Sequence, residues 1–236
     1  MQFSDKIIKL TAEAERELRP QFGEFDRIAY VNTARVLEAF SAHRVSEAMF
    51  APSTGYGYGD IGRDALDAIY ADVFGAEAAF VRHNIVNGTQ AIAIGLFGLL
   101  RPGDVMLSVT GKPYDTLEEV IGLRGEGKGS LKEYGISYKQ VELTPEGSID
   151  YDALQRAIGP ATRMVCLQRA TGYAWRKAIS IEEIRECTAF VKNIDPNIIC
   201  MADNCYGEFL HIQEPTDAGI DVMAGSLIKN PGGGLA

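Results

Sequence analysis

Two short apolar runs towards the end of the printed sequence decide the fold. The first reads Ile198-Ile199-Cys200-Met201-Ala202-Asp203-Asn204-Cys205-Tyr206-Gly207, and the second reads Asp221-Val222-Met223-Ala224-Gly225-Ser226-Leu227-Ile228-Lys229-Asn230-Pro231. Each run suits a buried strand of a parallel sheet, and each ends at one charged residue followed by turn-forming residues. This layout predicts that Asp203 and Lys229 lie at the carboxyl ends of strands. Open parallel sheets bind their ligands at that edge.

A carboxylate and an amine at one sheet edge permit two interpretations. For an arbitrary pair, a structural ion pair or a lysine in a solvated turn is the commoner one. The alternative is a site for pyridoxal 5′-phosphate, in which Lys229 forms a Schiff base and moves protons. Asp203 would then keep the pyridine nitrogen protonated, so that the ring accepts the electrons released at the substrate Cα. Ser226, three residues before Lys229, could direct its hydroxyl at the phosphate.

The segments Ala202–Phe209 and Gly225–Gly234 resemble the bacterial methionine gamma-lyase-like family, whose members are often labelled aluminium resistance proteins. The resemblance runs from about Phe22 to Ala236 and is most specific around Lys229. It implies a fold-type I pyridoxal-phosphate enzyme, related to the cystathionine lyases. We therefore expect an α/β fold: an N-terminal helical segment over residues 1–50, and a large cofactor-binding domain of the PLP-dependent transferase type over residues 51–236.

The pattern along the chain supports this fold class. From Ser4 to Arg19 it predicts an amphipathic helix that Pro20 ends, and from Phe25 to Met49 a second helical stretch. Helices and apolar strands then alternate, which predicts a mostly parallel, doubly wound sheet. The expected strands are 78–81, 104–109, 136–143, 163–167 and the two quoted runs. The expected helices are 63–74, one that opens near residue 88 and runs through Leu100, and one with Pro113 as its first residue, N1. Two more are expected from Tyr151 and after Ser180, where Glu183 completes a capping box.

Gly88, Thr89 and Gln90 open one of these helices and are candidates for a phosphate cradle. A helix N-terminus offers free backbone N–H groups and the positive end of the helix dipole. An ordinary N-cap is the alternative. In the family the usual pattern here is Ser-Gly-Thr-His, so Asn87 and Gln90 depart from it. The backbone cradle is kept, but no side-chain role is implied at position 90.

The resemblance also assigns three residues around the cofactor ring. Tyr114 matches the aromatic residue that stacks on the pyridine, although a tyrosine capping a helix end is an equal alternative. Tyr206, three residues after Asp203, could hydrogen-bond the phenolic oxygen of the cofactor. Arg169 could touch the cofactor or the substrate, and a surface arginine in a turn is its alternative.

Residues 52–64 alternate glycine with tyrosine, a pattern that suits no regular element and on composition alone indicates a surface loop. The resemblance implies that Tyr56 and Arg63 reach the cofactor phosphate of a neighbouring subunit, with Tyr58 as an alternative to Tyr56. A shared site of this kind implies a homodimer or a homotetramer.

The bulk properties exclude several classes of protein. The net charge of −9, with no basic block to offset it, argues against a nucleic-acid partner. No apolar window approaches the roughly 18 residues that a membrane span needs, and no signal peptide is evident. Four cysteines without CxxC spacing (Cys166, Cys187, Cys200 and Cys205) suit reduced thiols in the cytoplasm. Three histidines without ligand spacing predict no metal site.

The leading functional hypothesis is a carbon-sulfur lyase that uses pyridoxal 5′-phosphate on a sulfur amino acid such as methionine, cystathionine or a cysteine derivative. Alternatives are another fold-type I enzyme, such as an aminotransferase, and a non-catalytic subunit or fragment. Lys229 lies seven residues before the end of the 236-residue sequence. Related enzymes continue into a small domain that supplies an arginine for the substrate carboxylate. We therefore expect that domain to be absent, and the 236 residues alone to bind cofactor weakly, aggregate and turn over little.

Overall fold

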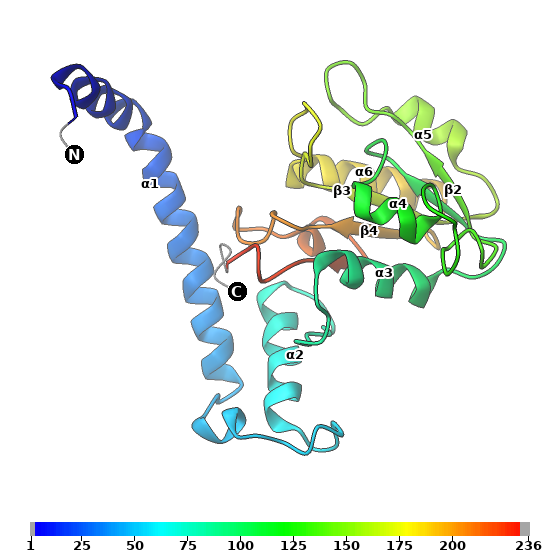
Figure 1. The fold of residues 1–236 in the computed structure, drawn as a ribbon, viewed down its shortest axis with the longest axis horizontal. Helices are drawn as coiled ribbons and strands as arrows, with labels where there is room; N and C mark the ends of the chain where they lie inside the picture. The colour runs from blue at the N-terminus through cyan, green and yellow to red at the C-terminus, as the bar shows by residue number, and fades with distance from the viewer. Residues whose placement is uncertain (1–2, 232–236) are drawn as a thin grey trace.

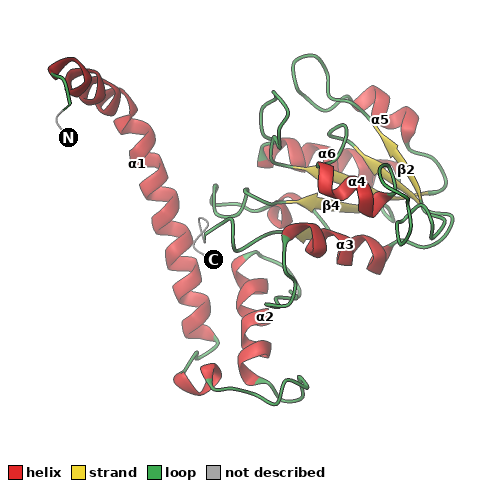
Figure 2. Ribbon diagram, in the orientation of Figure 1, coloured by secondary structure: helices red, strands yellow, loops and turns green. Residues whose placement is uncertain are grey.

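The computed structural model describes residues 3–231, which form an α/β fold around a five-stranded sheet (Figures 1 and 2). The strand order is β2-β1-β3-β4-β5 and every pairing is parallel, as expected. The strands are β1 (Val105–Ser108), β2 (Ser137–Gln140), β3 (Thr162–Gln168), β4 (Ile199–Asp203) and β5 (Val222–Ala224).

Helices cover both faces of the sheet, so the doubly wound architecture is confirmed. Helices α3 (Gly88–Leu99) and α4 (Asp115–Ile121) pack on one face, while α5 (Tyr151–Ala157) and α6 (Ile181–Ile194) pack on the other. Successive strand residues point to opposite faces. Fully or almost fully buried residues of the α3 face include Met106, Met164 and Met201, and those of the α6 face include Leu107, Val165 and Cys200.

The boundaries of most elements follow local signals that the sequence carries. Helix α2 (Ile61–Val73) begins after Asp60, whose side chain accepts from Arg63 N, and it ends before Gly75 at φ 62°. Ser180 and Glu183 form the expected capping box of α6. Such caps satisfy N–H groups that a helix leaves without partners, and for that reason they mark helix ends in a sequence.

The prediction of two N-terminal helices separated at Pro20 is wrong. A single 38-residue helix, α1 (Asp5–Ala42), contains Pro20, and a short 3₁₀ turn, η1 (Glu47–Phe50), follows. Proline removes one helix hydrogen bond and typically costs about 3 kcal/mol in a helix interior. Both Pro20 and Arg16, whose carbonyl loses its donor, are exposed, so water can replace that bond. Figure 1 shows the axis of α1 turning within its dark blue N-terminal part.

Two further expectations are wrong because side chains from other elements accept hydrogen bonds from the backbone N–H groups concerned. Residues 78–81 form no strand: Val81 N donates to Asp67 Oδ1 of α2 at 2.8 Å. Pro113 is not the first residue of α4, since Tyr114 is the N-cap and its N–H donates to Gln168 Oε1.

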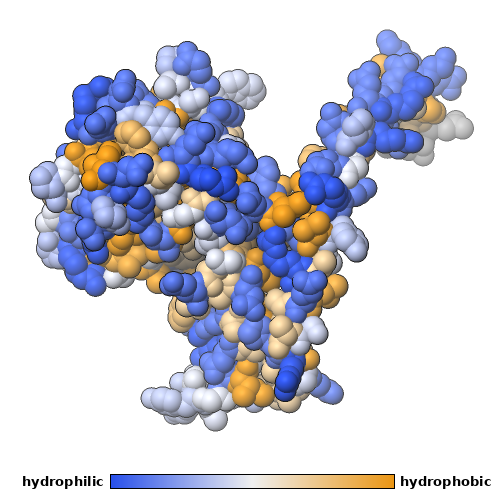
Figure 3. Space-filling view, turned by 180° about the vertical axis from the view of Figure 1, so that it is seen from behind, coloured by the Kyte–Doolittle hydropathy of each residue, from blue (hydrophilic) through white to orange (hydrophobic). Residues whose placement is uncertain are grey.

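Helix α1 is held against the rest of the molecule through its C-terminal half. Asn32 is buried and its Nδ2 donates to the carbonyls of Phe209 and His211, in the loop that follows β4. Arg35 Nη1 donates to the carbonyl of Val73, at the end of α2. The N-terminal half extends away from the sheet (Figure 1), and Figure 3 shows apolar surface along the helix. The side chains of Phe22 and Phe25 are among its exposed apolar residues. Among residues 3–231, no helix combines the length and the apolar character that crossing a bilayer requires.

Candidate active site

Asp203 lies at the carboxyl edge of the sheet, as predicted, because it is the last residue of β4. Its Cα pairs with Gln168 of β3 on one side and with Ala224 of β5 on the other. Its Oδ1 accepts from Cys205 N at 3.1 Å. Burial raises the pKa of Asp203, and the positive charge of Lys229 opposes that rise.

Lys229 lies in a turn beyond β5, and the strand before it is shorter than expected. β5 ends at Ala224, five residues before the lysine, because Ser226 N donates to the Glu208 carboxylate rather than to a neighbouring strand. Lys229 N donates to Ser226 O at 2.9 Å. Lys229 Nζ lies 4.2 Å from the ring centroid of Tyr206, a cation-π contact. Tyr206 itself adopts φ 69°, which turns the chain sharply after Asp203.

The first turn of α3 lies directly against both loops. A Cβ added to Gly88 would lie 2.7 Å from Cys205 Sγ and 3.7 Å from the Ser226 Cβ, so only glycine fits without displacement. Asn87 is the N-cap, and its Oδ1 accepts from Gln90 N at 2.8 Å. The first N–H groups of a helix have no acceptor within the helix and attract anions. The structure thus brings a helix N-terminus, Ser226 and the Asp203 loop together.

The side chains of Thr89 and Gln90 are engaged locally. Thr89 Oγ1 lies 2.7 Å from Thr116 Oγ1 of α4, which ties the two helices together. Gln90 Oε1 accepts from Val86 N at 2.8 Å and so closes the loop before α3. Both the backbone N–H and the side chain of Gln90 are therefore bonded within the turn that opens α3.

Tyr114 follows β1 and lies beside the loop after β3. Its ring stacks on Tyr173, with centroids 5.6 Å apart and an interplanar angle of 28°. The two hydroxyls are 3.3 Å apart, and this hydrogen bond is the main cause that raises the pKa of Tyr114 to about 12. The charge of Tyr206 makes a smaller contribution to the same rise in the pKa of Tyr114.

Arg169 is buried rather than a surface residue in a turn. Its Nη1 donates to Asn204 Oδ1 and to the Gly207 carbonyl, both at 2.8 Å. Burial lowers the pKa of Arg169, and the charges of Glu214 and Glu208 oppose that change. The guanidinium therefore supports the loop that follows Asp203, and its contact with cofactor or substrate stays a prediction.

Tyr56 and Arg63 lie apart from Lys229 within this chain. Tyr56 lies in the loop before α2 and Arg63 in the first turn of α2, at the end of that helix that points away from the sheet (Figure 1), and Tyr56 is 82% exposed. Arg63 Nε lies 3.5 Å from Asp60 Oδ2. Tyr58, the alternative, is 91% exposed. A role for any of them at the Lys229 site requires a second copy of the chain.

Sequence reasoning missed a buried polar network behind these residues. Asn204 Nδ2 donates to Glu214 Oε2 at 3.1 Å, and Phe209 N donates to Glu214 Oε1 at 2.8 Å. Asn204 and Glu208 are fully buried. The signal was present in the run that follows Asp203, where polar residues alternate with apolar ones, but a run alone does not say which of them are buried.

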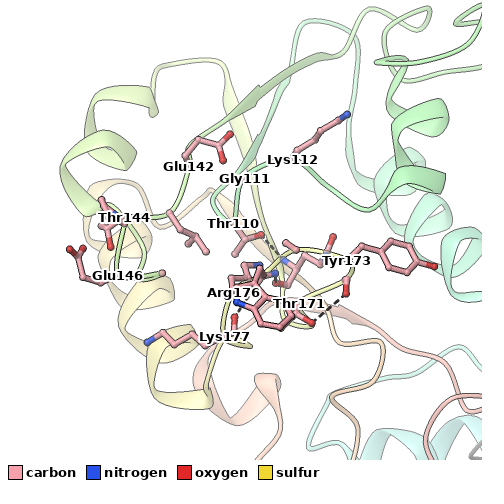
Figure 4. A pocket seen from close by; sticks show the side chains of 17 residues that line it. Thr110, Gly111, Lys112, Glu142, Thr144, Glu146, Thr171, Tyr173, Arg176 and Lys177 are labelled. Atoms are coloured by element: carbon pink, nitrogen blue, oxygen red, sulfur yellow. Dashed lines mark hydrogen bonds between the residues drawn. The ribbon is translucent and has the colours of Figure 1, made fainter.

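A large hollow lies beside these residues. A cavity of about 1030 Å³ opens between the loops after β1, β2 and β3 (Figure 4). Its lining includes Thr110, Glu142, Gln168, Tyr173 and Arg176, but not Asp203, Ser226 or Lys229. It adjoins the site through Gln168 and Tyr173, which contact Tyr114. Within residues 3–231, no group of three or more His, Cys, Asp or Glu side chains could hold a metal ion.

Comparisons with known proteins match the resemblance. The family model described as methionine gamma-lyase matches residues 7–236, which extends the similarity ahead of Phe22. An uncharacterised Bacillus subtilis protein, YnbB, is 54% identical over 233 residues, 98% of this chain and 55% of that protein.

Two solved structures share the fold closely. A Listeria innocua protein, described as a candidate cystathionine beta-lyase involved in aluminium resistance, is 53% identical with a TM-score of 0.95, and the match covers 100% of this chain and 57% of that one. A Clostridium novyi protein, described as a carbon-sulfur lyase involved in aluminium resistance, is 49% identical with a TM-score of 0.91, over 95% and 54% of the two chains. This chain spans about half the length of these relatives.

Proposed function

This chain belongs to the methionine gamma-lyase family, and from that membership we propose that it forms the cofactor-binding part of a carbon-sulfur lyase that uses pyridoxal 5′-phosphate. The observation that carries the proposal is the packing of Gly88, in the first turn of α3, against Cys205 in the loop after Asp203 and against Ser226 in the turn before Lys229. A structural ion pair does not account for this arrangement: among residues 3–231 no salt bridge joins Asp203 to Lys229, and an ion pair would not require a glycine at a helix N-terminus packed against the turn before the lysine.

The residues present fit the cofactor. The backbone N–H groups at Gly88 and Thr89, with the Ser226 hydroxyl, would hold the phosphate, because this is the kind of anion site that helix N-termini form. Asp203 would pair with the pyridine nitrogen, Tyr114 would lie over the ring, and Tyr206 would hydrogen-bond the phenolic oxygen. When bound, the cofactor supplies an acceptor for the electron pair released at the substrate Cα.

Lys229 would carry out the proton transfers. Its Nζ would hold the cofactor and would take the proton from the substrate Cα. The contact between Nζ and the Tyr206 ring stabilises the charged amine and limits where it can point. Asp203 would hold the proton on the ring nitrogen throughout.

The substrate we propose is a sulfur amino acid such as methionine or cystathionine, whose carbon-sulfur bond breaks after Cα deprotonation. We also propose that a second copy supplies Tyr56 and Arg63 to the phosphate, so that the site is completed in a homodimer or homotetramer. We propose that the main role of Arg169 is to support the loop after Asp203, through its hydrogen bonds to Asn204 and Gly207. A contact with substrate or cofactor would be a second role.

Reconstitution tests the cofactor step. The chain is mixed with pyridoxal 5′-phosphate, its absorbance is recorded, and borohydride then traps any covalent attachment for location by mass spectrometry. We expect attachment at Lys229 and none in Lys229→Ala. The control is Lys128→Ala, since Lys128 is exposed in a remote loop. Trapping spread evenly over surface lysines would contradict the site.

The lyase step is tested separately with methionine and cystathionine. A keto acid together with a thiol, formed with no amino acceptor present, supports elimination. A keto acid that forms only when an acceptor is added would indicate an aminotransferase instead. Attachment at Lys229 with neither product from either substrate, in this chain and in a full-length relative, would contradict lyase action on these substrates.

A further inference from the structure

Glu208 is fully buried and bonds to both sides of the segment that carries Lys229. Its carboxylate Oε1 accepts from Ser226 N at 2.5 Å. Its backbone carbonyl accepts from Asn230 Nδ2 at 3.0 Å. Ser226 and Asn230 flank the lysine, so one residue of the loop after β4 holds both ends of the turn after β5.

The carboxylate fits tightly against the backbone of that turn. A Cβ added to Gly225 would lie 2.5 Å from Glu208 Oε1 and 3.3 Å from its carboxyl carbon. No side chain larger than hydrogen therefore fits between Glu208 and the residue before Ser226. This close contact between Glu208 and Gly225 lies at the start of the turn, because β5 ends at the residue before Gly225.

Glu208 is not one half of an ion pair. Among residues 3–231, its Oε2 is buried without a hydrogen-bond partner, and no lysine or arginine forms a salt bridge with it. The charges of Asp203 and Glu214 help to raise the pKa of Glu208. The charge of Glu208 in turn raises the pKa values of Cys205 and Tyr70 and opposes the lowering of the pKa of Arg169. Burial is the main cause that raises the pKa of Glu208 to about 7.

We propose that Glu208 is a positioning residue, whose carboxyl group fixes the backbone at Ser226 and thereby the direction in which Lys229 and the Ser226 hydroxyl point. Ser226 O in turn accepts from the backbone N–H of Lys229 and of Asn230, so a fixed Ser226 fixes the turn around the lysine. What Lys229 does there rests on the proposed function, but how its segment is held does not.

Two variants distinguish between two roles of the Glu208 side chain: accepting a hydrogen bond from Ser226 N, and filling space in the core. Glu208→Gln keeps an oxygen that can accept from Ser226 N. Glu208→Met has similar length and fills the site, but it offers no comparable acceptor. A purely structural role in packing would be served by both, whereas positioning through the Ser226 amide is served by Gln alone. Glu183→Gln is the matched control, because Glu183 is also a carboxylate that accepts from a backbone N–H, at Ser180 in the cap of α6.

The measurement is hydrogen exchange of peptides covering residues 225–231 in the full 236-residue chain without cofactor. We expect at least tenfold faster exchange of the Ser226 amide in Glu208→Met, near-unchanged exchange in Glu208→Gln and Glu183→Gln, and no change in β3 for any of them. Equal exchange in the Met and Gln variants would overturn the proposal. If Glu208→Met does not fold, the shorter Glu208→Asp takes its place: exchange at Ser226 as slow as in the unmodified chain would overturn the proposal equally.

A second readout connects the segment to the cofactor. Borohydride trapping of pyridoxal 5′-phosphate at Lys229 is compared across the same variants, and we expect the Met variant to lose most of the label and the Gln variant to keep it. If the unmodified chain takes no label, the proposed function fails while the exchange result still decides the role of Glu208. If the Met variant keeps full labelling despite fast exchange, the positioning of Lys229 is wrong.

Discussion

Gly88 meets Cys205 so closely that a Cβ on the glycine would lie 2.7 Å from the sulfur. One residue opens α3 and the other follows Asp203 by two positions, so this contact sets the distance between the helix N-terminus and the carboxylate. The requirement for glycine arises from tertiary packing, since a helix start accepts alanine on local grounds.

Gly88→Ala should push α3 away from the sheet edge. We expect a loss of stability of about 1–3 kcal/mol, typical of inserting a methyl group into a packed site, and weaker binding of pyridoxal 5′-phosphate. Denaturant titration and a cofactor-binding titration measure the two effects. Gly98→Ala is the control in the same helix: a Cβ there meets nothing within 4 Å, so the change should be neutral or stabilising by up to about 1 kcal/mol. Equal effects at both positions would show that Gly88 is not closely packed.

Asp203→Asn separates attachment of the cofactor from its chemistry. The amide oxygen can still accept from Cys205 N, so the fold and the label at Lys229 should persist. A neutral amide cannot keep a proton on the ring nitrogen, and we expect the exchange of the substrate α-proton with D₂O to slow by roughly 10²-fold or more. Asp152→Asn, at an exposed position of α5, is the control. Unchanged α-proton exchange in Asp203→Asn would remove Asp203 from the proposed mechanism.

The stability of the chain should depend on pH through Glu208. The ordinary pKa of the carboxyl is 4.5 and burial raises it to about 7 in the folded chain, so between these values the unfolded chain releases a proton that the folded chain retains. The contribution of Glu208 to the free energy of unfolding is therefore fully present below pH 4.5. It is lost as the pH rises to about 7, which lowers the free energy of unfolding by roughly 3 kcal/mol for a shift of this size.

Glu208→Gln isolates this contribution, because Asp203 and Glu214 also have raised pKa values and add pH dependence of the same sign. The free energy of unfolding is measured by denaturant titration from pH 4 to pH 8 in both proteins. We expect the Gln variant to gain stability relative to the unmodified chain as the pH rises through this window. A constant difference between the two proteins would mean that Glu208 titrates normally.

Much of the site was predictable because it depends on local patterns. Asp203 at a strand end follows from the apolar run before it, and the N-terminus of α3 follows from the turn residues before its apolar stretch. The roles of Arg169 and Glu208 were not predictable, since their burial arises from loops after three different strands. The prediction at Pro20 was wrong for the opposite reason. Proline usually ends a helix on local grounds, but here the helix is exposed and continues through Pro20, because water can replace the lost hydrogen bond.

Arg63 provides the sharpest test of a site shared between subunits. Arg63 lies in the first turn of α2, at the end of that helix that points away from the sheet (Figure 1), and no contact joins it to Lys229 among residues 3–231. If a second copy supplies it, Lys229→Ala and Arg63→Ala should each bind cofactor poorly alone. A mixture that is unfolded and refolded together forms hybrid dimers in which one of the two sites has both residues intact. We therefore expect tight cofactor binding to reappear only in the co-refolded mixture. Random pairing makes half of the dimers hybrids with one intact site each, so up to about one site in four should bind.

The two variants refolded separately and then mixed are the control. No recovery after co-refolding, with hybrid dimers demonstrated by native mass spectrometry, would place Arg63 outside the cofactor site.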